Sequence, residues 1–209
     1  MNINNTSTLI ILDWDDTLFP TSWISNNKIE FLSNENKEIL YNKFFYKLDI
    51  KLVNLFKKMN KCGKIIIITN ALLNWIDMSI TILPETYKII NNNNNIKIVS
   101  ARGEFSKYTN DMTEWKKMAF KREVELLSKN KKINNIISIG DAVYEYNALI
   151  NLYNNDKNNY RLLKAVKFKR YPDIYEIDEQ IETLNDNIIN ICIKPAHLDL
   201  YFKELDRNY

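Results

Sequence analysis

Short apolar runs that alternate with helical segments constrain the fold of this chain more than any other feature. Five runs stand out, over residues 9–12, 65–68, 96–99, 136–139 and 162–168. The first, second and fourth are isoleucine-rich and almost unbroken, as is typical of parallel strands buried on both faces. This alternation predicts an α/β fold, a three-layer Rossmann-like architecture in which helices flank a central, mostly parallel sheet.

Helical periodicity fills the segments between these runs. Apolar residues at every third or fourth position from 40 to 59 predict a long helix over residues 35–60, and Gly63 marks its end. Pro84 is expected to end the next helix. The further helices are predicted over residues 75–83, 114–128 and 144–153 and from residue 178 to a break before residue 195. The asparagine run 91–95 predicts a polar loop.

The composition favours one ordinary globular domain. With 209 residues, 45% of them hydrophobic, the chain can bury a core without a disulfide or a structural metal. We expect a single domain over residues 1–209, with residues 19–34 as a small flap and residues 171–209 as a C-terminal helical segment packed on the core. Two cysteines and one histidine exclude a disulfide framework and a multi-histidine metal centre.

The sequence gives no indication of a membrane or a secretory route. No apolar run approaches the ~18 residues of a transmembrane helix. Residues 1–5 lack the basic and long apolar regions of a signal peptide. We therefore expect an intracellular, cytoplasmic protein that does not contact a membrane.

Polar residues follow three of the apolar runs directly. Asp13 and Asp15 follow the first run, Thr69 and Asn70 end the second, and Asp141 follows the fourth. In an open α/β sheet, ligands bind beyond the carboxyl ends of the strands, where the strand order reverses. These residues are therefore expected to converge on one acidic site.

An acidic site of this kind favours a divalent cation. At a separation of about 5 Å and an effective dielectric near 20, two carboxylates repel each other by roughly 3 kcal/mol. Mg²⁺ prefers oxygen ligands and shares them with water and substrate phosphates. Carboxylates, a hydroxyl group and a lysine around Mg²⁺ suit phosphoryl transfer, in which positioning and charge neutralisation dominate.

Four short motifs resemble those of the haloacid dehalogenase-like (HAD) phosphohydrolase superfamily, and they follow one another along the chain in the same order as in that family. The segment Asp13-Trp14-Asp15-Asp16-Thr17-Leu18 matches its DxDx[TV][LV] motif, and Thr69 matches the hydroxyl residue that ends the next catalytic strand. Lys116 stands where the family has a lysine, with Lys117 and Lys107 as alternatives, and Gly140-Asp141 through Glu145 fits GDxxxE. The motifs lie within residues 9–145, about two thirds of the chain.

The resemblance implies a role for each matching residue. Asp13 would be the nucleophile that forms an aspartyl-phosphate, and Asp15 the general acid and base. Thr69 would donate a hydrogen bond to the transferring phosphoryl group, and Lys116 would neutralise negative charge. Mg²⁺ would be held by Asp13, the main-chain carbonyl of Asp15 and Asp141, with Glu145 supporting these ligands or acting as an ordinary first-turn acid.

Two polar residues at the same edge are candidates for substrate binding. Asn70 follows Thr69 directly, although apart from the motifs the pair Thr69-Asn70 fits a plain strand end better. Arg102 follows the third apolar run, where its guanidinium can clamp a second phosphate or carboxylate of the substrate. A salt bridge between Arg102 and Glu104 is the alternative.

The spacing of the motifs leaves no room for a large cap domain, so the chain resembles the capless magnesium-dependent phosphatases of this superfamily. The expected function is a Mg²⁺-dependent phosphomonoester hydrolase whose partner is a phosphorylated small molecule or phosphoprotein. One alternative is a binding or regulatory protein that keeps this fold without turnover. Another is a nucleic-acid 3′-end phosphatase, because residues 107–170 carry 14 Lys and Arg against 7 Asp and Glu.

Overall fold

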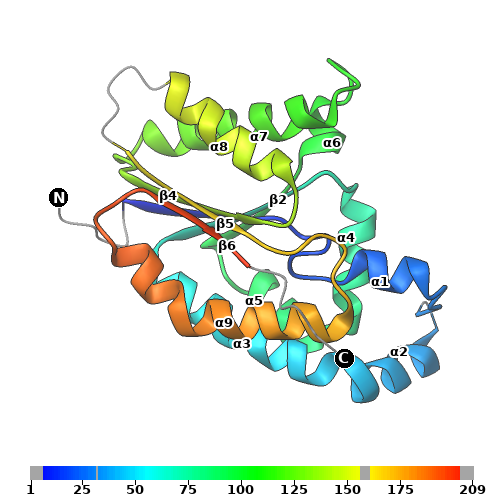
Figure 1. Cartoon of the computed structure of the whole chain (residues 1–209). Helices are drawn as coiled ribbons and strands as arrows, with labels where there is room; N and C mark the ends of the chain where they lie inside the picture. The colour runs from blue at the N-terminus through cyan, green and yellow to red at the C-terminus, as the bar shows by residue number, and fades with distance from the viewer. Residues whose placement is uncertain (1–6, 32, 156–160, 203–209) are drawn as a thin grey trace, which may run out of the picture.

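A central sheet of parallel strands organises the molecule (Figure 1). In this computed structural model, residues 7–31, 33–155 and 161–202 are described. Within them, six strands lie in the order β3-β2-β1-β4-β5-β6, and each neighbouring pair is parallel. This is the order of a doubly wound sheet, in which the strand order reverses beside β1. The strands are β1 (Thr8–Leu12), β2 (Lys64–Thr69), β3 (Ile96–Ser100), β4 (Asn135–Gly140), β5 (Leu162–Lys167) and β6 (Leu198–Tyr201).

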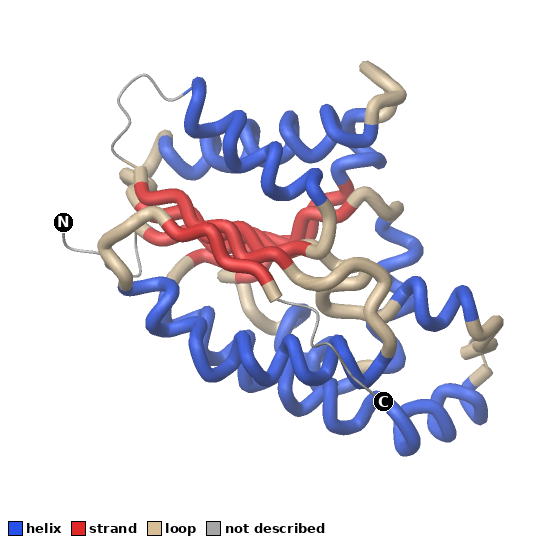
Figure 2. The backbone as a smooth tube through the Cα atoms, in the orientation of Figure 1, coloured by secondary structure: helices blue, strands red, loops and turns tan. Residues whose placement is uncertain are grey.

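Helices cover both faces of this sheet, so the predicted three-layer α/β fold is confirmed (Figure 2). In Figure 1, α6, α7 and α8 lie on one face, and α3, α5 and α9 on the other. The first set is α6 (Ala101–Phe105), α7 (Met112–Ser128) and α8 (Val143–Asn155). The second set is α3 (Tyr46–Cys62), α5 (Pro84–Asn91) and α9 (Ile174–Ile193). The remaining helices are α1 (Thr21–Asn26), α2 (Asn34–Leu40) and α4 (Leu73–Ser79).

The central strands send alternate side chains into two separate cores. In β1, Leu9 and Ile11 pack under α7 and α8, whereas Ile10 and Leu12 pack against the layer of α3 and α9. Successive side chains of a strand point to opposite faces, so an unbroken apolar run supplies both cores at once. This explains why β1, β2 and β4 are the most apolar runs of the sequence.

The long helix predicted over residues 35–60 is interrupted. It begins as α2, passes through a π-helical segment, Tyr41–Phe45, and continues as α3. The wider π-helical turn changes the phase of the helix. As a result Phe45 is fully buried while Phe44 is only partly buried. Gly63 follows the last residue of α3, as predicted.

The prediction that Pro84 ends a helix is wrong in part. The helix α4 passes into a 3₁₀ turn, Ile80–Ile82, and Pro84 then begins α5 instead of closing the preceding helix. Proline suits the first turn of a helix because the N–H group it lacks has no partner there. The buried carboxylate of Asp49 in α3 accepts hydrogen bonds from the amides of Glu85 and Thr86 at 3.0 and 2.8 Å. The residue that caps the start of α5 is thus distant in the sequence, so the local sequence does not predict this helix.

The C-terminal part of the chain differs most from the prediction. The helix α9 begins at Ile174, four residues earlier than expected, because Asp173 and Glu176 form a capping box. It packs on the core, as expected for residues 171–209, but the chain then adds β6 to the sheet. Residues 203–209 lie outside the described part, as do residues 1–6 and residue 32 of the expected flap.

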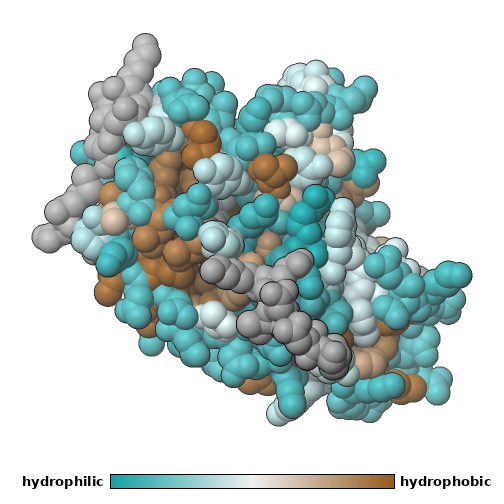
Figure 3. All heavy atoms as spheres, viewed as in Figure 1, coloured by the Kyte–Doolittle hydropathy of each residue, from teal (hydrophilic) through white to brown (hydrophobic). Residues whose placement is uncertain are grey.

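The sheet ends in a partly apolar edge. Figure 3 shows apolar side chains gathered on the face where β5 and β6 form this edge. Leu200 and Tyr201 of β6 are 38% and 66% exposed. In the described part of the chain, no helix combines the length and apolar character needed to cross a membrane.

Candidate active site

The loop that follows β1 is a tight turn held by its own backbone. The carbonyl of Trp14 accepts hydrogen bonds from the amides of Thr17, Leu18 and Phe19. Asp16 has a positive φ of 54°, and its carboxylate accepts a hydrogen bond from the amide of Ser22 at 2.8 Å. Asp16 therefore binds an amide in the first turn of α1 and acts as a residue of the turn. The turn places the side chains of Asp13 and Asp15 at the carboxyl end of the sheet.

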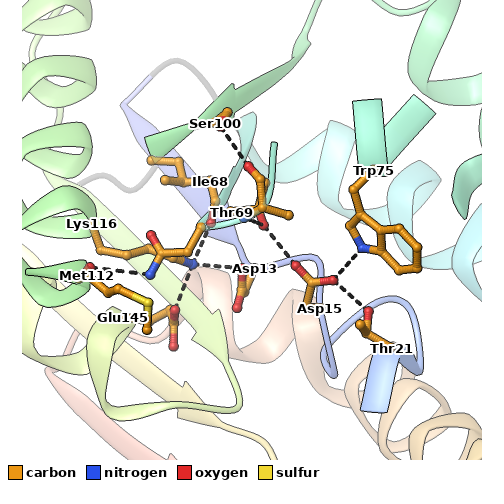
Figure 4. A network of polar contacts seen from close by, with 12 residues as sticks. Asp13, Asp15, Thr21, Ile68, Thr69, Trp75, Ser100, Met112, Lys116 and Glu145 are labelled. Atoms are coloured by element: carbon orange, nitrogen blue, oxygen red, sulfur yellow. Dashed lines mark hydrogen bonds and ion pairs between the residues drawn. The ribbon is translucent and has the colours of Figure 1, made fainter. Parts of the chain in front are cut away.

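Lys116 of α7 contacts Asp13 directly at the end of the sheet (Figure 4). Its ammonium group donates to Oδ1 of Asp13 at 2.7 Å and to the carbonyl of Ile68 at 2.6 Å, and it lies 2.7 Å from Oε1 of Glu145. The first two contacts are hydrogen bonds and the third is an ion pair. Burial lowers the pKa of Lys116, but the carboxylates of Asp13 and Glu145 outweigh burial and raise it above its ordinary value. The lysine is therefore a fixed positive charge.

The alternative lysines do not reach the acidic cluster. Lys117 pairs with Glu114 at 2.6 Å on the outer side of α7. Lys107 lies over the ring of Tyr108. Of the three, Lys116 is the lysine that contacts Asp13.

Three buried carboxylates gather around this ammonium group. Each of Asp13, Asp141 and Glu145 offers an oxygen within 4.8 Å of the others, and all three side chains are at least 90% buried. Burial, and then Glu145 and Asp16, raise the pKa of Asp141 to about 7. Burial also raises the pKa of Asp13 well above its usual value, although Lys116 opposes this.

The donor set of this cluster fits a cation. Three carboxylates face one ammonium group, which leaves two negative charges uncompensated when all are ionised. Oε2 of Glu145 is buried and accepts no hydrogen bond from any residue that the structure describes. A buried acceptor of this kind needs an ion or a water molecule. The cluster can therefore hold a metal ion, and its oxygens suit a hard divalent cation.

Gly140 makes the position of Glu145 possible. A β-carbon at residue 140 would lie 2.5 Å from Cγ and 2.7 Å from Cδ of Glu145. Real β-carbons essentially never approach a neighbour this closely. A side chain at residue 140 would therefore have to displace the Glu145 side chain, which the first turn of α8 brings back against the end of β4.

Asp15 faces away from the carboxylate cluster. Oδ1 of Asp15 accepts hydrogen bonds from the hydroxyl of Thr21 at 2.6 Å and the indole N–H of Trp75 at 2.7 Å. Oδ2 accepts one from the hydroxyl of Thr69 at 3.0 Å. In Figure 4, Asp13 lies beside Lys116, whereas Asp15 lies beside Trp75 and Thr21. The side chain of Asp15 is therefore not part of the metal cluster, and only its main-chain carbonyl remains a candidate ligand.

Thr69 holds Asp15 at the end of β2. Its hydroxyl donates to Asp15 and accepts a hydrogen bond from the amide of Ala71 at 2.9 Å. Because a hydroxyl has one hydrogen to donate, Thr69 must turn away from Asp15 before it can donate to a phosphate oxygen.

The two substrate-binding candidates lie at the border of the site. The amide of Asn70 donates to the carbonyl of Met112 at 3.3 Å, which ties the end of β2 to the start of α7. Arg102 is exposed and its guanidinium lies 6.0 Å from the ring centre of Trp115. Glu104 pairs with Arg122, so it is not the partner of Arg102.

A large cavity opens beside Asp15. It has a volume of about 1210 Å³ and is bordered by Asp15, Asn70 and Arg102. Most of its wall comes from α1, residues 28–31, Ser33 and α4. Its large apolar lining residues are Ile24, Ile29, Phe31, Leu72, Trp75 and Met78.

The sequence did not identify every residue that shapes this site. Thr21 and Trp75 hold Asp15 in place, yet neither belongs to a motif, and no spacing rule links Trp75 to a residue 60 positions away. Glu145 was expected to support the metal ligands, whereas it lies in the cluster itself. Its place after Gly140-Asp141 was the only available signal.

Comparisons of this chain with protein-family models, with curated proteins and with solved structures found no match. The functional conclusion therefore depends on the motifs of the sequence and the geometry of the site.

Proposed function

We propose that this protein is a Mg²⁺-dependent phosphomonoester hydrolase of the capless HAD type that acts through an aspartyl-phosphate on Asp13. The observation that carries the proposal is the buried contact between Lys116 and Asp13 within a cluster of carboxylates. The cluster lies at the carboxyl ends of β1 and β4, where the strand order reverses. This is the expected ligand site of a doubly wound sheet.

Mg²⁺ would be held by Asp13, Asp141 and the carbonyl of Asp15, with Glu145 as a further carboxylate of the same cluster. When bound, the ion would neutralise charge on the cluster and on the phosphate oxygens. The chain supplies the other positive charge through Lys116, which is fixed by Ile68 and two carboxylates.

Asp13 is suited to be the nucleophile. Lys116 engages its Oδ1, and no described residue donates a hydrogen bond to its Oδ2. An oxygen of Asp13 would attack phosphorus and form a P–O bond as the bond to the leaving alcohol breaks. The proton that the alcohol needs would come from Asp15.

Asp15 is suited to move that proton. Three donors fix its carboxylate, and three of its roughly four acceptor positions are occupied. After protonating the leaving alcohol, the carboxylate would take a proton from water as the water oxygen attacks phosphorus. The bond between phosphorus and Asp13 then breaks, which releases phosphate and restores the Asp13 carboxylate and the protonated carboxyl group of Asp15.

The test is hydrolysis of a generic aryl phosphate. We expect turnover that needs Mg²⁺ and is lost in Asp13→Asn and in Asp15→Asn. A matched control is Asp199→Asn, since Asp199 is exposed on β6 and should leave turnover unchanged. Absence of turnover across a broad panel of phosphomonoesters would contradict the proposal.

Thermal unfolding with a phosphate analogue distinguishes a phosphatase from a binding protein that has no turnover. Beryllium fluoride with Mg²⁺ imitates a phosphoryl group on an aspartate, so a phosphatase of this type should be stabilised against heat by the two together. Failure of this stabilisation would favour the idle binding protein.

No observation favours the nucleic-acid alternative. Of the basic residues in segment 107–170, Lys116 and Lys164 are buried. Lys117, Arg122 and Lys169 pair with glutamates. Burial and these ion pairs compete with contacts to the phosphates of a nucleic acid.

A further inference from the structure

The cavity beside Asp15 is larger and more apolar than the cleavage of a phosphate ester requires. Its volume of about 1210 Å³ far exceeds that of a phosphate group. Leu72 and Met78 remain 44% and 40% exposed along its wall, although both are large apolar side chains. An exposed apolar surface inside a hollow is typical of a ligand site.

Asp15 joins this cavity to the proposed reaction centre. Its carboxylate borders the cavity, and Thr69 links it to the end of β2 beside Asp13. In the proposed reaction Asp15 protonates the leaving oxygen. The alcohol attached to that oxygen must therefore lie on the Asp15 side of the phosphate, which is the side of the cavity.

The side chain of Trp75 contacts both Asp15 and the cavity. Its indole N–H donates to Oδ1 of Asp15 at 2.7 Å, while the residue also lines the cavity. A group that packs against the indole ring would thus contact the residue that positions the general acid. Binding in the cavity and proton transfer are in this way physically linked.

We propose that this cavity binds the leaving group of the substrate and that this leaving group is a large apolar alcohol. The inference rests on the proposed function for the place of the phosphate. The cavity also has polar lining residues such as Ser25, Asn36 and Asn74. Along the part of the wall formed by Ile29, Leu72 and Met78, however, a hydroxyl would find no hydrogen-bond partner, which is unfavourable. An alkyl or aryl group instead gains free energy from contact with the same side chains.

The experiment measures binding separately from turnover. n-Alkyl phosphonates from methyl to octyl cannot be hydrolysed, because a carbon atom replaces the bridging oxygen. Titration calorimetry with the Mg²⁺-loaded protein should show affinity rising about two- to fourfold for each added methylene until the cavity is filled. Met78→Gln, which keeps the side-chain length and adds a polar amide, should reduce the octyl-to-methyl affinity ratio by about fivefold or more.

The matched control is Ile193→Asn, since Ile193 is 57% exposed at the end of α9 and does not line the cavity. It should leave the affinity ratio unchanged. The inference would be overturned if affinity did not rise with chain length, or if the affinity ratio changed equally in both variants. In that case the cavity would be a site for a protein partner instead. A rise with chain length in a protein that hydrolyses no phosphomonoester would support the ligand site and contradict the proposed function instead.

Discussion

Gly140 and Glu145 are in such close contact that a β-carbon at residue 140 would lie 2.5 Å from Cγ of the glutamate. The contact joins the last residue of β4 to the first turn of α8. It also keeps the Glu145 carboxylate 2.7 Å from the ammonium group of Lys116. The absence of a side chain at residue 140 thus leaves room for the Glu145 side chain in the position it takes in the acidic cluster.

Gly140→Ala should therefore disrupt the cluster. Because the clash involves carbons held by a buried ion pair, we expect the variant to lose about 1–3 kcal/mol of unfolding free energy. It should also lose most of the stabilisation by Mg²⁺. Denaturant unfolding with and without Mg²⁺ measures both effects. In a Glu145→Ala background the same substitution should cost much less, and equal costs in the two backgrounds would contradict the proposed clash.

Removal of the central positive charge should have a larger effect. Lys116→Met leaves the carboxylates of Asp13 and Glu145 and the carbonyl of Ile68 without their shared donor. Losing one partner of a buried ion pair costs about 3–5 kcal/mol in the absence of metal. Lys117→Met is the matched control one residue along α7, where a partly exposed pair with Glu114 contributes at most about 1 kcal/mol. If urea unfolding showed similar losses of unfolding free energy in Lys116→Met and Lys117→Met, Lys116 would not be the central charge of the cluster.

The indole of Trp75 should affect the rate of the reaction more than the stability of the fold. Trp75→Phe keeps an aromatic ring in the cavity but removes the hydrogen bond to Asp15. A hydrogen bond to a charged group contributes about 1.5–3 kcal/mol, so kcat for an aryl phosphate should fall about tenfold or more. The control is Trp115→Phe, because the indole N–H of Trp115 donates to the carbonyl of Thr109 at 2.7 Å and not to a catalytic residue. A kcat that falls equally in both variants would exclude a positioning role.

The sequence predicted the parts of the fold that depend on local pattern. The strands β1, β2 and β4 were found because each is apolar on both faces, and α7 and α8 because their periodicity is regular. The helix α5 and the strand β6 were missed. The cap of α5 comes from Asp49, 35 positions before Pro84, and β6 is a short, exposed edge strand.

The residues of the candidate site likewise fall into those that a local pattern predicts and those that it does not. The residues of the four motifs follow strand ends, so the parallel sheet itself brings Asp13, Thr69 and Asp141 to one edge. Trp75 and Thr21 reach Asp15 only because α1 and α4 pack beside the loop after β1. Contacts of this kind depend on tertiary packing, and no local pattern records them.

The role of Asp49 can be tested through the stability of α5. Asp49→Ala removes the acceptor for the amides of Glu85 and Thr86, which lie at the buried start of this helix. We expect a loss of about 1–3 kcal/mol in unfolding free energy. Asp111→Ala, which removes an exposed cap of α7, should cost less because water can replace the carboxylate. Equal losses in thermal unfolding would contradict the buried cap.

Stability should depend on pH in a way that reveals the carboxylate cluster. The pKa of Asp141 is raised to about 7 by burial and by Glu145 and Asp16, so the folded protein keeps a proton that the unfolded chain loses near pH 4. Stability without metal should therefore fall as the pH rises from about 4 to about 7 and then level off.

Mg²⁺ should reverse this trend, because the ion binds ionised carboxylates and competes with the proton. The increase in Tm on adding Mg²⁺ should be small near pH 5 and large near pH 8, where an ion at about 100 times its Kd contributes about 2.7 kcal/mol. Thermal unfolding in Mg²⁺ or a chelator across this range measures the effect. Asp141→Asn should weaken both pH trends, with the remainder due to the raised pKa of Asp13, whereas Asp199→Asn, on the exposed edge strand, should leave them unchanged. A Mg²⁺ effect that is independent of pH would mean that the ion does not bind at Asp141.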